Sequence, residues 1–140
     1  FRAQAATVTV GVRAMIDRAV AENTSMIVDG VSILPGLIDP EQWAGEAHLI
    51  FLVVATLDEE EFRQRFEARA RDAAHRPPHR YVAHLESILL IQDHILELAE
   101  AFDVPIVDNT SFDASVLSIV RHVTEALKKR LDGDVEELLA

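Results

Sequence analysis

The chain has 140 residues, with 13 Lys or Arg against 24 Asp or Glu, so its formal net charge at pH 7 is −11. This acidity excludes a general attraction for nucleic acids or anionic membranes, and the absence of cysteine excludes disulfides and thiolate metal sites. With 49% hydrophobic residues, the chain can bury the core of one domain, which we expect to span residues 1–140 in the cytoplasm. The longest apolar run, residues 49–55, is too short to cross a membrane.

Hydrophobic spacing and turn signals predict alternating helices and strands. The predicted elements are, in chain order, a helix through residues 8–19, a strand at 26–28, a loop at 31–40, a strand at 48–55, a helix from 58 to about 74, a helix at 81–102, a strand at 104–108 and a helix from about 112 through 131. We expect Thr7 or Thr9 to cap the first helix, and Ser111 or Asp113 to cap the last.

This order predicts an α/β fold with a parallel sheet between two helical layers. Residues 49–55 are apolar at every position, which is typical of a parallel strand covered on both faces. About three strands are few for such a sheet. Because the sequence also begins at Phe1 without a methionine, we expect the sheet to be incomplete and further strands to precede this chain.

Polar side chains follow two of the predicted strands. Asp29 precedes Gly30 at the end of the first strand, where open α/β sheets bind ligands. The alternative is a turn in which Asp29 bonds its own backbone. Asp108-Asn109-Thr110 ends the third strand at the same edge, where a helix cap is again the alternative.

Arginines are concentrated in one segment of this acidic chain. Paired guanidinium hydrogen bonds suit phosphate oxygens, so the cluster predicts an anion site. The alternative is a solvated helix face that includes a Glu61–Arg65 ion pair. The cluster consists of Arg63, Arg65, Arg69, Arg71, Arg76 and Arg80.

Other site chemistry is weakly supported. The spacing of His75, His79 and His84 matches no zinc pattern, and Pro77-Pro78 interrupts any shared helix face, so we expect no metal site there. The sequence contains neither G-x-x-x-x-G-K-[ST] nor G-x-G-x-x-G, and therefore neither common phosphate-binding loop.

In this order the segments resemble 2-phosphoglycerate kinases, a family of P-loop kinases. Residues 25–36, S-M-I-V-D-G-V-S-I-L-P-G, are similar to a family pattern close to I-[IV]-E-G-V-H-x-x-P-G. The resemblance spans roughly residues 8–122. It continues through Arg65-Phe66-x-x-Arg69, Arg76, Arg80-Tyr81, Ile91-Gln92 and residues 104–109.

The resemblance implies an ATP-dependent phosphotransferase that acts on a small phosphorylated hydroxy acid such as 2-phosphoglycerate. In the family, a first strand and a P-loop precede residue 1 and bind most of ATP and Mg²⁺, so this chain alone is expected to be inactive. Residues 58–80 would form a lid over the phosphates. By matching positions, the catalytic residues would be Asp29, Arg65 and Arg69. The substrate-binding residues would be Ser32, Arg76 and Arg80, and Asn109 would lie near the base of the nucleotide.

Three positions depart from the family pattern: Asp29 replaces Glu, Ser32 replaces His, and Arg80 replaces Lys. The first two lie on the acceptor side, which leaves the acceptor open. One alternative is a non-catalytic, kinase-like module that binds an anionic metabolite or a partner protein. Another is an assembly domain that pairs exposed sheet edges. The expected partners are the phosphorylated substrate and either a second copy or the amino-terminal segment.

Overall fold

The structure, a computed structural model, describes residues 1–72 and 84–139. For residues 66, 69–72 and 132–139 it describes the backbone only. Its elements confirm an α/β chain with a parallel sheet. They are α1 (Arg2–Ala21), a 3-10 helix (Pro40–Trp43), β1 (Val53–Ala55), α2 (Glu59–Asp72), α4 (Leu85–Ala101), β2 (Ile106–Asp108) and α5 (Phe112–Leu139).

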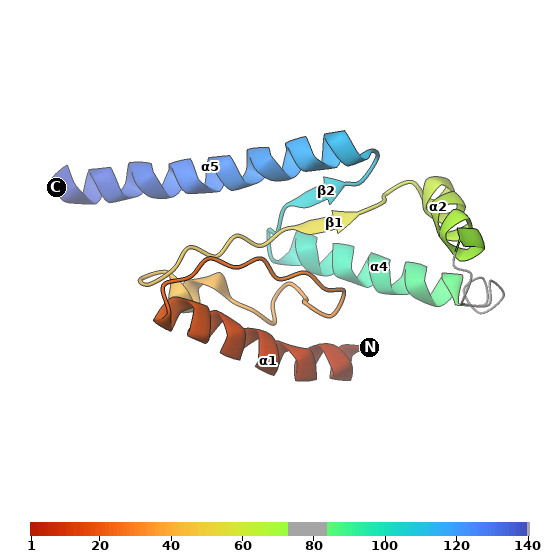
Figure 1. Cartoon of the computed structure of the whole chain (residues 1–140), viewed down its shortest axis with the longest axis horizontal. Helices are drawn as coiled ribbons and strands as arrows, with labels where there is room; N and C mark the ends of the chain where they lie inside the picture. The colour runs from red at the N-terminus through yellow and green to blue at the C-terminus, as the bar shows by residue number, and fades with distance from the viewer. Residues whose placement is uncertain (73–83, 140) are drawn as a thin grey trace.

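The sheet of the described residues consists of β1 and β2, which run parallel, with Val53 opposite Ile106 and Ala55 opposite Asp108. Figure 1 shows this sheet between α4 on one side and α5 on the other. Val53 and Ala55 are buried against Ala99 of α4. The expected arrangement of a sheet between helices is therefore present, and its strands end at the edge that faces α2.

The first of the three expected strands, residues 26–28, is wrong. These residues are extended but form no ladder with another described strand. A strand needs a neighbour that satisfies its backbone N–H and C=O groups, and a hydrophobic run alone does not supply one. The side chain of Ile27 is 98% exposed, in agreement with an unpaired segment.

The expected strand at 48–55 is shortened to Val53–Ala55, because β2 offers a partner for only these residues. The expectation that both faces of this strand are covered is also wrong. Val53 and Ala55 are buried, but Val54 points to the other face and is 46% exposed.

The helix starts agree with the sequence at α2 and α5 but not at α1. Ser111 Oγ accepts a hydrogen bond from Ala114 N–H and caps α5, as predicted. Helix α1 begins at Arg2, so the predicted caps Thr7 and Thr9 are wrong. Both hydroxyls lie inside the helix and donate to backbone carbonyls four residues earlier. Among the described residues, no helix is long and apolar enough to cross a bilayer.

A second cluster of buried residues packs the loop at residues 31–40 against α1. Val12, Ile38 and Trp43 are buried together, and the Trp43 indole N–H donates to Asp17 Oδ1 at 2.8 Å. The Arg13 guanidinium donates to the Leu37 carbonyl oxygen at 2.9 Å. These contacts tie α1 to the loop that carries Ser32.

Candidate functional site

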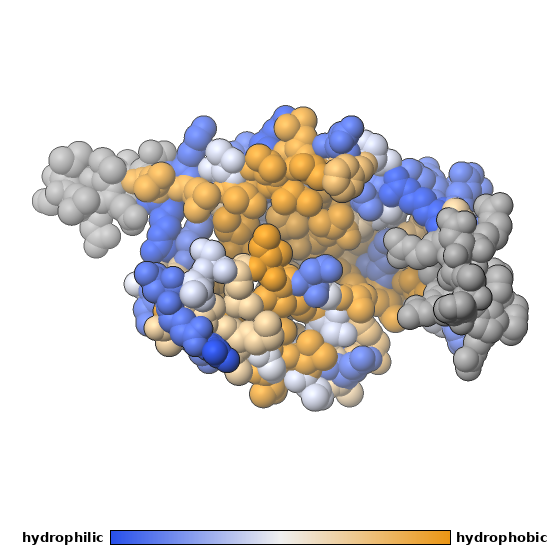
Figure 2. Space-filling model, viewed as in Figure 1, coloured by the Kyte–Doolittle hydropathy of each residue, from blue (hydrophilic) through white to orange (hydrophobic). Residues whose placement is uncertain are grey.

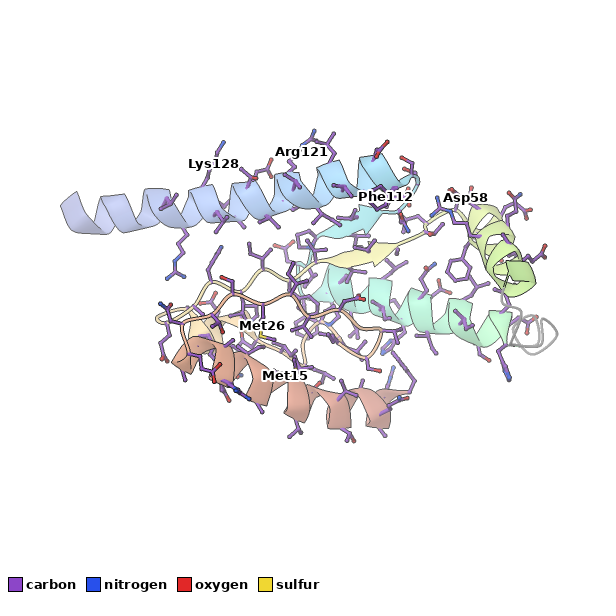
Figure 3. All side chains as sticks on the ribbon, in the orientation of Figure 1. Met15, Met26, Asp58, Phe112, Arg121 and Lys128 are labelled. Carbon is purple, nitrogen blue, oxygen red and sulfur yellow. The ribbon has the colours of Figure 1, made fainter. Side chains whose placement is uncertain are left out.

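The carboxyl ends of β1 and β2 are joined by two hydrogen bonds beyond the last sheet residues. Asn109 N–H donates to the Ala55 carbonyl oxygen at 2.7 Å, and Asp108 Oδ1 accepts from Leu57 N–H at 3.2 Å. In Figure 3, Asp58 and Phe112 lie where the strands lead into α2 and α5, at the same end of the sheet. The structure thus places Asp108 and Asn109 at a sheet edge, as the sequence predicts.

The start of α2 is held at this edge from two directions. Asp58 Oδ1 accepts a hydrogen bond from Glu61 N–H at 2.7 Å and caps the helix. The Gln92 side-chain amide on α4 donates to the Thr56 carbonyl oxygen at 3.1 Å. Glu59, Glu60 and Glu61 occupy the first turn, where the helix dipole favours negative charge. The segment between β1 and α2 is therefore held by the Asp58 cap on α2 and by the hydrogen bond from α4.

Arg65 connects α2 to the turn after β2. Its guanidinium donates to the backbone carbonyl oxygens of Asn109 and Thr110 and pairs with the Glu61 carboxylate one helical turn earlier. The Arg65 side chain is 38% exposed. Two residues predicted for the site, Arg65 and Asn109, are thus in direct contact, and the ion pair given as the alternative is also present.

Arg63 lies on the same helix but is used differently. It pairs with Glu59 at 2.7 Å, and both side chains face solvent. The hydrogen bond that Arg63 donates to the Glu59 carboxylate raises the pKa of Arg63, so its guanidinium keeps its charge. Arg63 therefore provides a matched cation on α2 that does not reach the turn after β2.

The Asn109 side chain is positioned by a residue that the sequence did not single out. The Ser115 hydroxyl, which is buried, lies 2.9 Å from Asn109 Oδ1 and 2.8 Å from the Ser111 carbonyl oxygen. The only signal for this role in the sequence is that Ser115 follows the cap residue Ser111 by one helical turn. The bond from Gln92 to Thr56 likewise became visible only in the tertiary structure.

Ser32 lies on the turn that follows the extended segment, and Asp29 directly precedes this turn. Ile33 N–H closes this turn by donating to the Gly30 carbonyl oxygen at 3.1 Å. Asp29 is exposed, and no hydrogen bond from the described residues reaches its carboxylate. The alternative in which Asp29 bonds its own backbone is therefore not observed. Ser32 is half-buried.

A groove lies next to the segment that carries Asp29 and Ser32, but no residue predicted for the site lines it. Val31, between Asp29 and Ser32, lines it together with Ala55 of β1 and Phe62 of α2. No hydrogen bond or ion pair between described residues joins Asp29 or Ser32 to Arg65. The structure thus brings Arg65 and Asn109 together and does not join Asp29 or Ser32 to them.

Several predicted residues have no described side chain. Arg69 lies on α2, one turn after Arg65, and only its backbone is described. Arg76 and Arg80 lie outside the described residues, as do His75 and His79. Within residues 1–72 and 84–139, no group of three or more His, Cys, Asp or Glu side chains is placed to hold a metal ion.

Curated proteins similar to this chain carry the name 2-phosphoglycerate kinase. The protein from Pyrococcus horikoshii is 32% identical over 139 residues, which cover 99% of this chain and 44% of the relative. The protein from Methanocaldococcus jannaschii is 31% identical over 139 residues, with 98% and 44% covered. The protein from Methanopyrus kandleri is 37% identical over 123 residues, with 87% and 37% covered.

The resemblance that the sequence predicted is confirmed by these relatives. The chain spans less than half the length of each of the three. No protein-family model matches the chain, and no solved structure matches it.

Proposed function

We propose that this chain, which is 2-phosphoglycerate kinase-like over nearly its whole length, supplies the acceptor and lid side of an ATP-dependent phosphotransferase. The acceptor would be a small phosphorylated hydroxy acid such as 2-phosphoglycerate. The observation that carries this proposal is the contact between Arg65 and Asn109 at the carboxyl edge of a parallel sheet. Open α/β sheets bind ligands at this edge.

Phosphoryl transfer needs positive charge around the moving phosphoryl group more than it needs covalent chemistry. The Arg65 guanidinium supplies such a charge, and in this structure its acceptors include two backbone carbonyl oxygens. Phosphate oxygens carry full charge and form stronger hydrogen bonds with guanidinium than neutral carbonyls do. A phosphate at this edge would therefore replace the carbonyls as partners of Arg65. Arg69 would act beside it on the same helix.

Asp29 is suited to the acceptor side because its carboxylate is exposed and accepts no hydrogen bond from the described residues. It would either orient the acceptor hydroxyl or hold Mg²⁺ through water. Ser32 lies in the turn that follows and would contact the acceptor. Arg76 and Arg80 are proposed to bind the acceptor phosphate from the second part of the lid.

We propose that these residues do not form a complete ATP and Mg²⁺ site by themselves. They include no group of three or more metal-binding side chains, and the whole sequence lacks a P-loop motif. We therefore assign most of the binding of Mg²⁺ and of the ATP phosphates to polypeptide outside these 140 residues. Calorimetry of the isolated chain with Mg-ATP should show no binding tighter than about 1 mM, or about −4 kcal/mol. Micromolar binding would contradict this assignment.

A chimera tests the proposal directly. The 140-residue chain replaces the 139 matching residues of the Pyrococcus horikoshii relative, and ATP-dependent phosphorylation of 2-phosphoglycerate is followed by phosphorus NMR. We expect turnover in the chimera. Arg69→Ala should lower it about a hundredfold or more, because a charge contact made in the transition state is worth several kcal/mol. Arg63→Ala is the matched control and should leave turnover unchanged.

The chimera also separates the catalytic proposal from the binding-module alternative. A folded chimera that binds 2-phosphoglycerate without transferring phosphate would favour a non-catalytic module. The observation that favours this alternative is that Arg65 already has internal acceptors. A folded chimera that neither binds nor phosphorylates the acid would contradict both.

A further inference from the structure

A hollow lies at the amino-terminal end of the sheet and is called the amino-end pocket below. It is lined by Phe51, which precedes β1, and by Val104 and Pro105, which precede β2. In Figure 1 both strands point towards α2, so their amino ends lie at the opposite end of the sheet. The pocket has a volume of about 510 Å³, within the roughly 300–1,000 Å³ of small-molecule pockets. It is therefore large enough for a small ligand and separate from the edge where Arg65 contacts Asn109.

Two segments that are far apart in the sequence form the walls of the amino-end pocket. One wall is the loop that packs against α1, which contributes Ile38 and Asp39. The other wall is the turn from α4 to β2, which contributes Phe102 and Asp103. The two walls are in close contact, because a Cβ added at Gly36 would overlap the Phe102 ring. The pocket is therefore a product of tertiary packing and not of one exposed loop.

The lining of the amino-end pocket is acidic and aromatic. Its described residues include the exposed Asp39 and Asp103 and no Lys, Arg or His. Asp39 Oδ1 accepts a hydrogen bond from Glu41 N–H at 3.1 Å, and no hydrogen bond or ion pair from the described residues reaches the Asp103 carboxylate. Phe102 is 55% exposed, so its ring is open to a ligand. Such a lining repels phosphate and attracts a cation, which both carboxylates and ring faces stabilise.

The apolar part of the lining distinguishes an organic cation from a metal ion. Among the described residues, no group of three or more side chains is placed to hold a metal ion. Figure 2 shows apolar surface across the middle of the molecule, and the amino-end pocket differs from it by combining apolar side chains with carboxylates. An ammonium group on an aliphatic chain matches both parts, because its methylene groups pack on apolar side chains while its charge stays beside a carboxylate. The apolar side chains of the lining include Ile38, Phe51 and Val104.

We propose that the amino-end pocket binds a small aliphatic polyamine. One ammonium group would pair with the Asp103 carboxylate beside the Phe102 ring, and a second would pair with the Asp39 oxygen that accepts no hydrogen bond. The net charge of −11 concentrates such cations around the chain. The proposal involves neither Arg65 nor Asn109, so it does not depend on the proposed phosphoryl transfer.

Spermidine is the probe for this site, and its binding to the 140-residue chain is measured by calorimetry and NMR at neutral pH. We expect one saturable site, with chemical-shift changes at Phe51, Phe102 and Asp103. Nuclear Overhauser contacts should join the spermidine methylene protons to the Phe102 ring. Hexaamminecobalt(III) carries the same charge as spermidine without methylene groups and should not displace it. 2-Phosphoglycerate should not compete, which separates this site from the acceptor site.

Asp103→Asn tests the pairing with the carboxylate. Asp103 has a φ of +52°, and asparagine tolerates this left-handed conformation, so the variant should fold. We expect the affinity for spermidine to fall about fivefold or more. Asp93→Asn removes the same charge from an exposed position on α4 that does not line the pocket, and it should lower the affinity less than about twofold. Phe102→Leu removes the ring and should lower it about two- to fivefold.

Equal losses of affinity in Asp103→Asn and Asp93→Asn would overturn the proposal. Displacement of spermidine by hexaamminecobalt(III) would do the same, since spermidine would then be a counterion of the acidic surface. If Asp103→Asn does not fold, the contacts with the Phe102 ring in the unaltered chain decide, and their absence overturns the proposal. The titration is repeated with the folded chimera. Loss of binding there would also overturn it, because polypeptide outside these 140 residues would then fill the pocket; where the chimera does not fold, the isolated chain decides.

Discussion

Arg65 on α2 and Asn109 after β2 are 44 positions apart in the sequence, and the Arg65 guanidinium donates a hydrogen bond to the Asn109 backbone carbonyl oxygen. This contact joins the start of the predicted lid to the sheet edge. The bonds of Asp108 to Leu57 and of Asn109 to Ala55 hold the same edge together. The position of α2 therefore depends on the turn after β2 as well as on its own strand.

Arg65→Ala should destabilise the isolated chain. The substitution leaves the carbonyl oxygens of Asn109 and Thr110 without their guanidinium partner and removes the pair with Glu61. Because the side chain is 38% exposed, water replaces part of these bonds, and we expect a loss of about 1–2 kcal/mol in the free energy of unfolding. Urea denaturation measures it.

Arg63→Ala is the matched control for this change, because it removes an exposed cation from the same helix without touching the turn after β2. It should leave the denaturation midpoint unchanged. Equal effects of the two substitutions would show that Arg65 contributes only helix charge, and that its contacts with Asn109 and Thr110 do not stabilise the chain.

Asp29→Asn should lower turnover of the chimera by about tenfold or more, equivalent to 1.4 kcal/mol in the barrier. It should hardly change the melting temperature, since the carboxylate is exposed and accepts no hydrogen bond from the described residues. Asp93→Asn removes the same charge from an exposed position on α4 and serves as the control. A loss of stability at unchanged turnover would indicate that Asp29 is a turn residue.

Gly36→Ala should destabilise the chain by about 1–3 kcal/mol. Gly36 has a φ of +81°, and an added Cβ would overlap the Phe102 ring. Gly11→Ala in α1 meets nothing within 4 Å and should stabilise by about 0.5–1 kcal/mol, because alanine favours helix. Thermal unfolding of both variants checks the opposite signs. A neutral Gly36→Ala would show that Phe102 does not hold the loop that carries Ser32.

The sequence predicted the elements whose determinants are local. The apolar spacing of α4 and α5 and the Ser111 cap depend on residues within a few positions of each other. The same holds for the Glu61–Arg65 pair. The order of these elements was enough to predict an α/β chain, and the ordered motifs were enough to identify the kinase relatives.

Only the tertiary structure decided which strands form and what Arg65 contacts. Residues 26–28 have the composition of a strand, yet a strand exists only where a neighbour pairs with its backbone, and β2 pairs with Val53–Ala55 instead. Arg65 was assigned to phosphate from its residue type and spacing. Its bonds to Asn109 and Thr110 depend on how α2 packs against a turn 44 and 45 positions away, and helical periodicity carries no information about contacts at that separation.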